Sequence, residues 1–153
     1  MLGYEWISDE FNKRVRLAVG KDIPIAWKNK KFVPDQKKVW LKVMLAPTSE
    51  SMVTLGDSGH NELPGFYQVA IFSPLNTGTQ KQSEILDSLR KTFKLGTRFV
   101  CPEDYTLRIT GFDFSQGGQM SLNDFTRGGV EENWDANFIT IYWSAREPRN
   151  TED

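Results

Sequence analysis

The segment from Lys38 to Pro47, KVWLKVMLAP, constrains the fold most, because both faces of the strand that it predicts are largely apolar. Successive side chains of a strand point to opposite sides. One face would carry Val39, Leu41, Val43 and Leu45. The other would carry Trp40, Lys42 and Met44. The first face therefore predicts a core beneath the strand, and the second is too apolar to meet plain solvent.

Two helices are predicted, one before this strand and one after it. The first begins at Ser8, whose side-chain oxygen can cap a helix, and it ends at Gly20. Its apolar residues at helical spacing are Phe11, Val15 and Ala18. The second runs from Gln80 to Lys94, with an apolar stripe of Ile85, Leu86, Leu89 and Phe93. Both helices therefore have one face that needs a partner.

Further strands are predicted where apolar residues alternate. They are a short edge strand from Ile23 to Trp27 and the segments 66–72, 98–101, 105–114 and 137–144. Residues 51–55 either extend the strand before them or begin the next one. Two polar loops are predicted, from Gly56 to Gly65 and from Ser115 to Gly129. Strands and helices do not alternate regularly, which predicts an α+β fold, a mostly antiparallel sheet with two main helices packed on one face.

The size and composition predict a single soluble domain. The 153 residues suit one core, which we expect over residues 1–146, followed by a flexible C-terminal tail over residues 147–153. Cys101 is the single cysteine, so no intramolecular disulfide is expected and a reducing compartment fits. The start of the sequence lacks the apolar region of a signal peptide, and no apolar run approaches the roughly 20 residues of a membrane span. We expect no membrane association.

Charge is distributed unevenly although the net charge is −1. Residues 1–42 carry ten Lys and Arg against five Asp and Glu, whereas residues 103–153 carry four against ten. The near-neutral total gives no argument for sequence-independent nucleic-acid binding. The asymmetry indicates either ordinary solvated faces or one basic and one acidic surface, suited to head-to-tail contact between copies.

The turn after Phe72, SPLNTGTQKQ, is the first candidate for chemistry. A glycine loop between a strand and a helix N-terminus can bind phosphate. This loop has one glycine and lacks the Gly-Lys-Ser/Thr sequence of a phosphate-binding loop. Thr79 and Gln82 instead have the spacing of a capping box, in which each side chain bonds the backbone amide of the other. We interpret the segment as a capped connection and expect no cofactor.

No catalytic or metal-binding set is predicted. The sequence GDSGH, residues 56–60, shares four letters with the nucleophile region of trypsin-like proteases, but His60 is the single histidine and follows Ser58 by two residues. The upstream histidine base of that family is therefore missing. One Cys and one His cannot supply the usual ligands of zinc. The acidic candidates for magnesium are Glu103, Asp104, Glu131, Glu132 and Asp135, which we interpret as solvated charge. The chain is predicted not to be an enzyme.

Aromatic residues gather near the predicted sheet, and some fall on the face opposite the presumed core. They are Trp27, Phe32, Trp40, Tyr67 and Phe72. Two interpretations remain open for that second face. Helices of the same chain could close it, or it could be buried against another subunit, where aromatic residues are enriched.

Taken together, three stretches resemble the tail terminator, or tail-completion, proteins of long-tailed bacteriophages. They are IPIAWKNKKFVPDQKKVWLKVMLAP, GFYQVAIFSPLNTGTQKQSEILDSLRKTFKLGTRF and NFITIYWSAREP. The matching positions are Asn29, Phe32 and Pro34, Trp40, the run GFYQV at 65–69 with Pro74 and Gly78, Phe93 and Gly96, and the last strand at 138–143. The resemblance covers roughly residues 20–100 well and the last strand weakly. The loop from Ser115 to Gly129 departs from the family pattern.

The resemblance implies a structural protein of the virion, at the head-proximal end of the tail. Family members assemble as a ring, usually a hexamer, on the last ring of the tail tube, stop its polymerisation and present a surface for head joining. The partners implied are further copies of the chain, the tail tube protein and a head-completion or neck protein. Assembly would take place in the host cytoplasm, and DNA would pass through the ring without sequence-specific binding.

Ten residues are predicted to lie at subunit or tail-tube interfaces. They are Trp27, Phe32, Trp40, Lys42, Met44, Asp57, His60, Gln119, Met120 and Arg127. The segments most expected to touch the tube or a neighbour are those from Pro47 to Pro64 and from Ser115 to Gly129. Two alternatives stay open, a neck or head-completion ring protein and, from another class, a small nucleotide-binding enzyme that uses the loop after Phe72.

Overall fold

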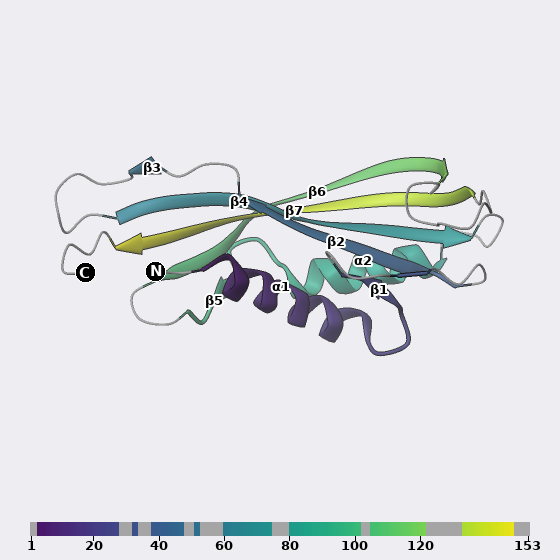
Figure 1. The fold of residues 1–153 in the computed structure, drawn as a ribbon, viewed down its shortest axis with the longest axis horizontal. Coiled ribbons are helices and arrows are strands. Elements are labelled where there is room, and N and C mark those ends of the chain that lie inside the picture. The colour runs from purple at the N-terminus through teal and green to yellow at the C-terminus, as the bar shows by residue number, and fades with distance from the viewer. Residues whose placement is uncertain are drawn as a thin grey trace.

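The computed structural model describes residues 3–27, 32–33, 38–47, 51–52, 60–74, 80–101, 105–121 and 133–148. In chain order the elements are α1 (Tyr4–Val19), β1 (Ile25–Ala26), β2 (Trp40–Pro47), β3 (Ser51–Met52), β4 (His60–Pro74), α2 (Gln80–Thr92), β5 (Arg98–Phe99), β6 (Thr106–Ser121) and β7 (Asn133–Pro148). Figure 1 shows one long, curled sheet with both helices beneath it. The predicted α+β class is confirmed.

The sheet is built around three long strands. Its order is β1-β2-β4-β7-β6-β5, and β3 pairs with β4 beside the end of β2. Every described pairing is antiparallel except the parallel one between β1 and β2. The pairing of β6 with β7 shifts between Ile109 and Gly111 and again between Gln116 and Gly118. Such bulges increase the local twist of a sheet.

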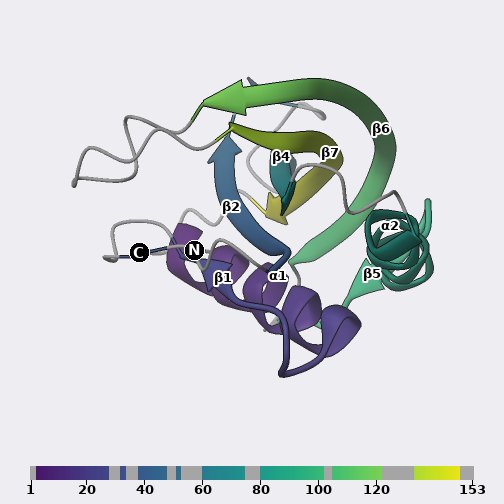
Figure 2. The ribbon, with the colours of Figure 1, turned by 90° about the vertical axis from the view of Figure 1, so that its right-hand side faces the viewer.

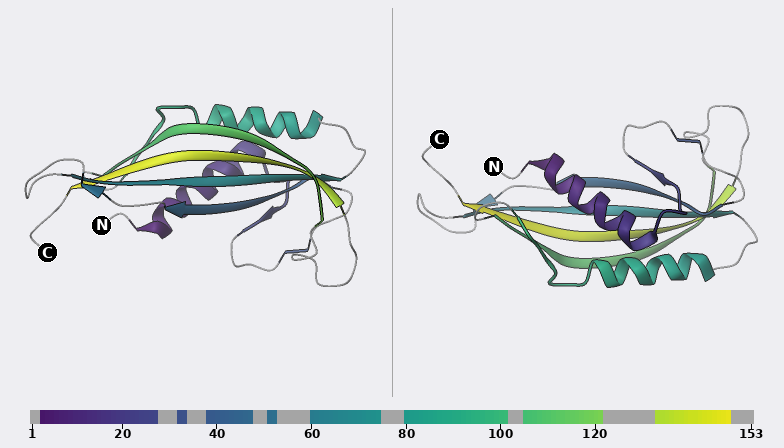
Figure 3. Two further views of the ribbon diagram at one scale, coloured as in Figure 1. Left: turned by 90° about the horizontal axis from the view of Figure 1, so that it is seen from above. Right: turned by 90° about the horizontal axis from the view of Figure 1, so that it is seen from below.

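The main core lies between the sheet and the two helices. Figure 3 shows α1 behind the sheet when the molecule is seen from above and in front of it when seen from below, with α2 alongside β6. The helices contribute Ile7, Phe11, Val15, Ile85 and Leu89 to this core, and Phe93 joins it directly after α2. Phe11 lies at its centre, stacked on Tyr67 and on Phe93 with ring centroids 4.9 and 5.5 Å apart. The two predicted apolar stripes are therefore confirmed.

The predicted start of the first helix at Ser8 is wrong. The helix begins at Tyr4 after Gly3, which provides no side-chain cap, and Ser8 lies in the second turn. Ile7 is fully buried, and this packing holds the first turn without a capping side chain. The predicted stop is confirmed, since Gly20 has a φ of 82° and donates its backbone N–H to the Arg16 carbonyl.

Both predicted polar loops are wrong where the structure describes them. Residues 60–65 belong to β4, where they pair with β7, and residues 115–121 belong to β6, where they pair with the first half of β7. Pairing with a long neighbouring strand overrides the turn-like composition of these segments. Residues 56–59 and 122–129 lie outside the described part of the chain.

The remaining predictions concern strand lengths and the C-terminus. The edge strand is confirmed as β1, and the strands predicted at 38–47, 66–72 and 137–144 lie in or largely in β2, β4 and β7. β7 includes Glu147 and Pro148, and residues 149–153 lie outside the described residues. The boundary between domain and tail at residues 146 and 147 stays a prediction.

Candidate functional site

The outer edge of β2 is open beyond its first residues. β1 pairs only with Leu41 and Lys42, and no described strand pairs with the rest of β2 on that side. The Leu41 N–H donates to the Pro24 carbonyl at 3.0 Å. The backbone N–H and C=O groups of the odd-numbered residues of β2 therefore point toward this edge. Leu45 follows this alternation, as does Pro47, which has no N–H to donate. Such an edge can accept another strand.

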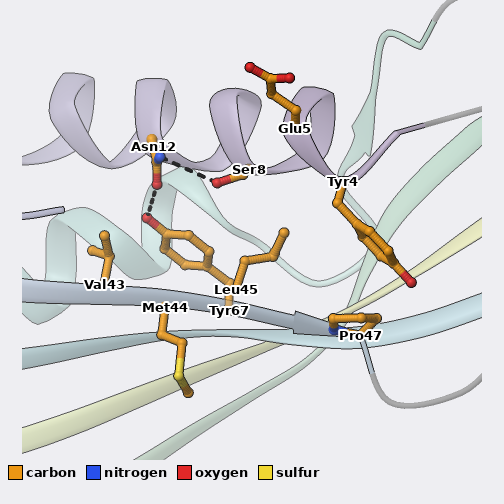
Figure 4. A pocket seen from close by; sticks show the side chains of 9 residues that line it. All are labelled: Tyr4, Glu5, Ser8, Asn12, Val43, Met44, Leu45, Pro47 and Tyr67. Carbon is orange, nitrogen blue, oxygen red and sulfur yellow. Dashed lines mark hydrogen bonds between the residues drawn. The ribbon is translucent and has the colours of Figure 1, made fainter. Parts of the chain in front are cut away.

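A groove of about 390 Å³ lies on the helix side of this edge. Its lining residues are Tyr4, Glu5, Ser8, Asn12, Val43, Met44, Leu45, Pro47 and Tyr67. Figure 4 shows the groove between α1 and β2, with Leu45 and Tyr67 facing the helix, and Glu5 and Met44 pointing away. The Tyr4 side chain at its rim is 50% exposed. The groove therefore offers mainly aromatic and aliphatic surface.

A short chain of hydrogen bonds crosses from the sheet to the helix in the groove. The Tyr67 hydroxyl donates to Asn12 Oδ1 at 2.7 Å, and Asn12 Nδ2 donates to Ser8 Oγ at 3.5 Å. Burial raises the pKa of Tyr67 well above its ordinary value. The hydroxyl is therefore neutral at physiological pH and remains a donor to Asn12.

We expect Tyr67→Phe to lower the free energy of unfolding by about 1–2 kcal/mol, because Asn12 Oδ1 loses its donor. The raised pKa also fixes the pH dependence. Neutral Tyr67 stabilises the fold fully below the ordinary pKa of about 10, and this contribution is lost as the pH rises further. Urea unfolding from pH 7 to 11 should show a steeper alkaline loss of stability for the wild type than for Tyr67→Phe. Parallel pH curves would contradict this.

The other outer strand, β6, also has an open edge. β5 pairs only with Leu107 and Arg108, and the Ile109 amide donates to the Thr97 carbonyl at 2.9 Å. No described strand pairs with the rest of β6 on that side. Phe114 is 45% exposed there, whereas Phe112 is half-buried against the main core. The sheet therefore has two open edges, both lined with apolar side chains.

Two rows of directly paired residues connect these edges. One consists of Val43, Val69, Ile139 and Phe114. The other consists of Leu45, Tyr67, Ile141 and Phe112. Residues directly opposite each other on paired strands share a face of the sheet. Phe112 and Phe114 thus stand on the same face as the groove, at the opposite edge.

Of the two interpretations left open for the second face, closure by helices is not seen in the described part of the chain, where neither helix covers that face. One end is closed within the chain by a small cluster of Trp40, Phe72 and Trp134, against which Phe32 packs. Trp40 stacks on Phe72 with ring centroids 4.4 Å apart and is only 1% exposed. Trp40 is therefore buried within the chain itself, and its predicted place at an interface stays a prediction.

The other end of the second face is more open. Met44 is 39% and Tyr142 40% exposed, and the Tyr142 hydroxyl donates to Asp113 Oδ2 at 3.1 Å. Lys42 lies between the two ends, and partial burial lowers its pKa. Apolar and polar side chains thus alternate on a surface that a partner could cover.

The fold and these surfaces can be compared with known proteins. The family model of the phage tail terminator protein matches residues 6–126, from α1 to the end of β6 and beyond. The chain belongs to the phage tail terminator family. The resemblance inferred from the sequence is confirmed, and the matched residues include all of the groove lining except Tyr4 and Glu5.

The solved structures support the same fold for this terminator. One solved chain matches with a TM-score of 0.62 over 95% of this chain and 96% of that chain, at 20% sequence identity. A likeness at this identity shows the fold alone. No curated protein matches the chain.

Membership of the terminator family makes this chain a structural component of the phage tail with a role in tail completion. The family is one of structural proteins, and its members interact with tail and head-joining components. Neither described helix of this terminator has the length and apolar character needed to cross a membrane. Within the described residues, no three His, Cys, Asp or Glu side chains gather as metal ligands would.

The predicted interface residues are spread over the terminator fold. Lys42 and Met44 lie on the second face, and Phe32 packs on Trp40. Trp27 lies on the helix side, where the Arg16 guanidinium carbon is 5.7 Å from the Trp27 ring centroid. His60 begins β4, and Gln119 and Met120 lie near the end of β6. Asp57 and Arg127 lie outside the described residues. A shared role for these residues stays a prediction.

A buried polar cluster is the feature that the sequence interpretation missed. Gln82 on α2 donates to Ser73 Oγ at 2.7 Å and to Asp135 Oδ2 at 3.2 Å, and it accepts a hydrogen bond from Asn137 Nδ2. Gln82 therefore bonds to β4 and β7, while the predicted capping partner Thr79 lies outside the described residues. The sequence signal that could have indicated this cluster was a polar residue, Gln82, on the helix face that also carries Ile85.

We expect Gln82→Ala to lower the free energy of unfolding by about 1–2 kcal/mol. Ser73 and Asn137 are buried and would lose a shared partner, which costs more than an exposed hydrogen bond is worth. Gln80→Ala is the matched control, because Gln80 is exposed in the same turn and bonds only weakly to Glu84 at 3.4 Å. Denaturant unfolding that gave both variants the same stability would contradict the role of this cluster.

Proposed function

We propose that the chain closes into a ring of identical subunits on the end of the tail tube. The ring stops tube polymerisation at full length and provides the surface for head joining, while DNA passes through its centre. The tail-completion role of the family supports this proposal. The observation that carries it is the pair of open edges on β2 and β6, described above.

The directions of the strands make these edges complementary. β2 is antiparallel to β4, β4 to β7 and β7 to β6, so β2 and β6 run in opposite directions. Rotation about a ring axis roughly along the strands preserves strand direction. The β2 edge of one copy would then meet the β6 edge of the next in antiparallel orientation. A head-to-tail contact of this kind closes into a ring when its rotation fits.

The chain also has the opposite charges that a head-to-tail contact favours. Residues 1–42, which lead through α1 into β2, carry five more basic than acidic side chains, and residues 103–153, which contain β6 and β7, carry six more acidic than basic ones. Opposite charges on meeting surfaces increase the rate of association and suppress wrong pairings.

Electron microscopy of phage lacking this protein tests the proposal. We expect tails of irregular length that do not join heads. Tails of normal, uniform length that join heads would reject termination as the function. A wild-type gene supplied in trans is the control, and it should restore uniform tails.

Two further measurements separate the alternatives. A terminator should co-purify with the tail tube protein before any head is present, whereas a neck protein should require heads. Isothermal titration with common nucleotides should give no heat, and measurable binding would favour the nucleotide-binding alternative.

A further inference from the structure

We propose that the groove between α1 and β2 receives Phe114 of the neighbouring copy. The contact places an aromatic anchor beside the pairing of the β2 and β6 edges, and the inference rests on the proposed ring. It assigns a partner to a groove and to an exposed aromatic side chain that the fold of one chain leaves uncovered.

The faces of the sheet agree with this contact. Phe114 shares a row with Val43, and Phe112 shares a row with Leu45, so both aromatic residues lie on the groove's side of the sheet. When β6 of one copy extends the sheet of the next, side chains on one face stay on that face. The neighbour's Phe114 therefore meets the groove, whereas side chains on the neighbour's second face cannot reach the groove.

The open parts of the two edges also overlap. β1 pairs with β2 up to Lys42, and β2 ends at Pro47. Residues 43–46 of β2 are therefore left with an edge that can pair with another strand. In the same rows, β6 contributes residues 111–114, and β5 stops before them at Arg108. A neighbour that pairs without a shift in register brings Phe114 beside Val43, where the groove lies.

The chemistry of the groove suits an aromatic ring. Leu45 and Tyr67 form its wall and Tyr4 its rim, while the acidic Glu5 points away from the space. Phe114 is 45% exposed in the single chain, so the contact buries a large aromatic side chain. Buried aromatic anchors contribute much of the energy of protein interfaces.

Cross-linking between two single-cysteine proteins tests the contact. Both carry Cys101→Ser, and one adds Leu45→Cys while the other adds Phe114→Cys. Rings assembled on tail tubes from the mixture should give cross-linked dimers with a short bismaleimide, and neither protein alone should. Leu45→Cys mixed with Tyr142→Cys is the control, since Tyr142 is similarly exposed but lies on the second face, and it should give none.

The outcomes separate the contact from the ring. Assembled rings without cross-links in the mixture overturn the contact and leave the ring standing, whereas wild-type protein that leaves tube ends without rings overturns both. As a second measurement, Phe114→Ala should weaken ring assembly at least about tenfold and Tyr142→Ala should not. Equal assembly by both variants, with unchanged melting temperatures, would also reject the contact.

Discussion

Phe11→Ala should lower the free energy of unfolding by about 3–5 kcal/mol, the largest effect expected for a single side chain here. Phe11 is fully buried and touches the aromatic rings of Tyr67 on the sheet and of Phe93, directly after α2. Its ring centroid lies 5.0 Å from that of Phe99 and 6.3 Å from that of Trp143. Several rigid rings surround the site, so the cavity left by alanine cannot collapse, and the loss should lie in the upper part of that range.

Guanidinium unfolding of the wild type, Phe11→Ala and Phe11→Leu measures this effect. Leucine refills much of the volume, so we expect it to restore more than half of the loss. Leu17→Ala is the control on the same helix, because Leu17 is exposed. A loss below about 1.5 kcal/mol for Phe11→Ala would show that α1 does not close the core as described.

Gly65→Ala should lower the free energy of unfolding by about 3 kcal/mol, at the upper end of the cost of overpacking. A Cβ at this position would lie 2.7 Å from the Ala46 carbonyl oxygen and would also overlap the Trp143 ring. Neither neighbour can move freely, because Ala46 belongs to the paired backbone of β2 and Trp143 is buried. Glycine is therefore required where β2, β4 and β7 meet.

Gly111→Ala is the matched control for this prediction. Its Cβ would lie 2.9 Å from Tyr142 Cδ2, but Tyr142 is partly exposed and can turn away. We expect a loss of about 1 kcal/mol or less. Thermal unfolding of the two variants should therefore give clearly different melting temperatures, and equal values would contradict the close approach at Gly65.

The fold could be predicted where apolar periodicity was strong. The stripes on α1 and α2 and the alternation of Leu41 and Val43 depend on local spacing, and each was confirmed. Strand ends could not be predicted in the same way. The glycines and polar residues at 56–65 and 115–129 have the composition of loops, and only pairing with β7 turns the described parts of them into strands.

The candidate site was harder to predict than the fold. Trp40 was expected at an interface because it lies on the second face, but Phe72 and Trp134, distant in sequence, bury it. The groove and the exposure of Phe114 depend on which strands lie at the edges, and strand order cannot be inferred from spacing along the chain. Sequence motifs identified the family, whereas the contact surfaces required the three-dimensional arrangement.

The short open stretch of β2 has a consequence for the subunit before assembly. β1 covers one end of this edge and Pro47 blocks the other, so a stray strand can form only a few backbone hydrogen bonds with it. A single such pairing is weak, so we expect free chains that meet in solution to separate again. Closure of the proposed ring would use both edges of every subunit at once and leave no free end, so the last subunit would stabilise all the others. We therefore expect this short edge to keep the free protein from forming fibres and to make assembly of the proposed ring all-or-none.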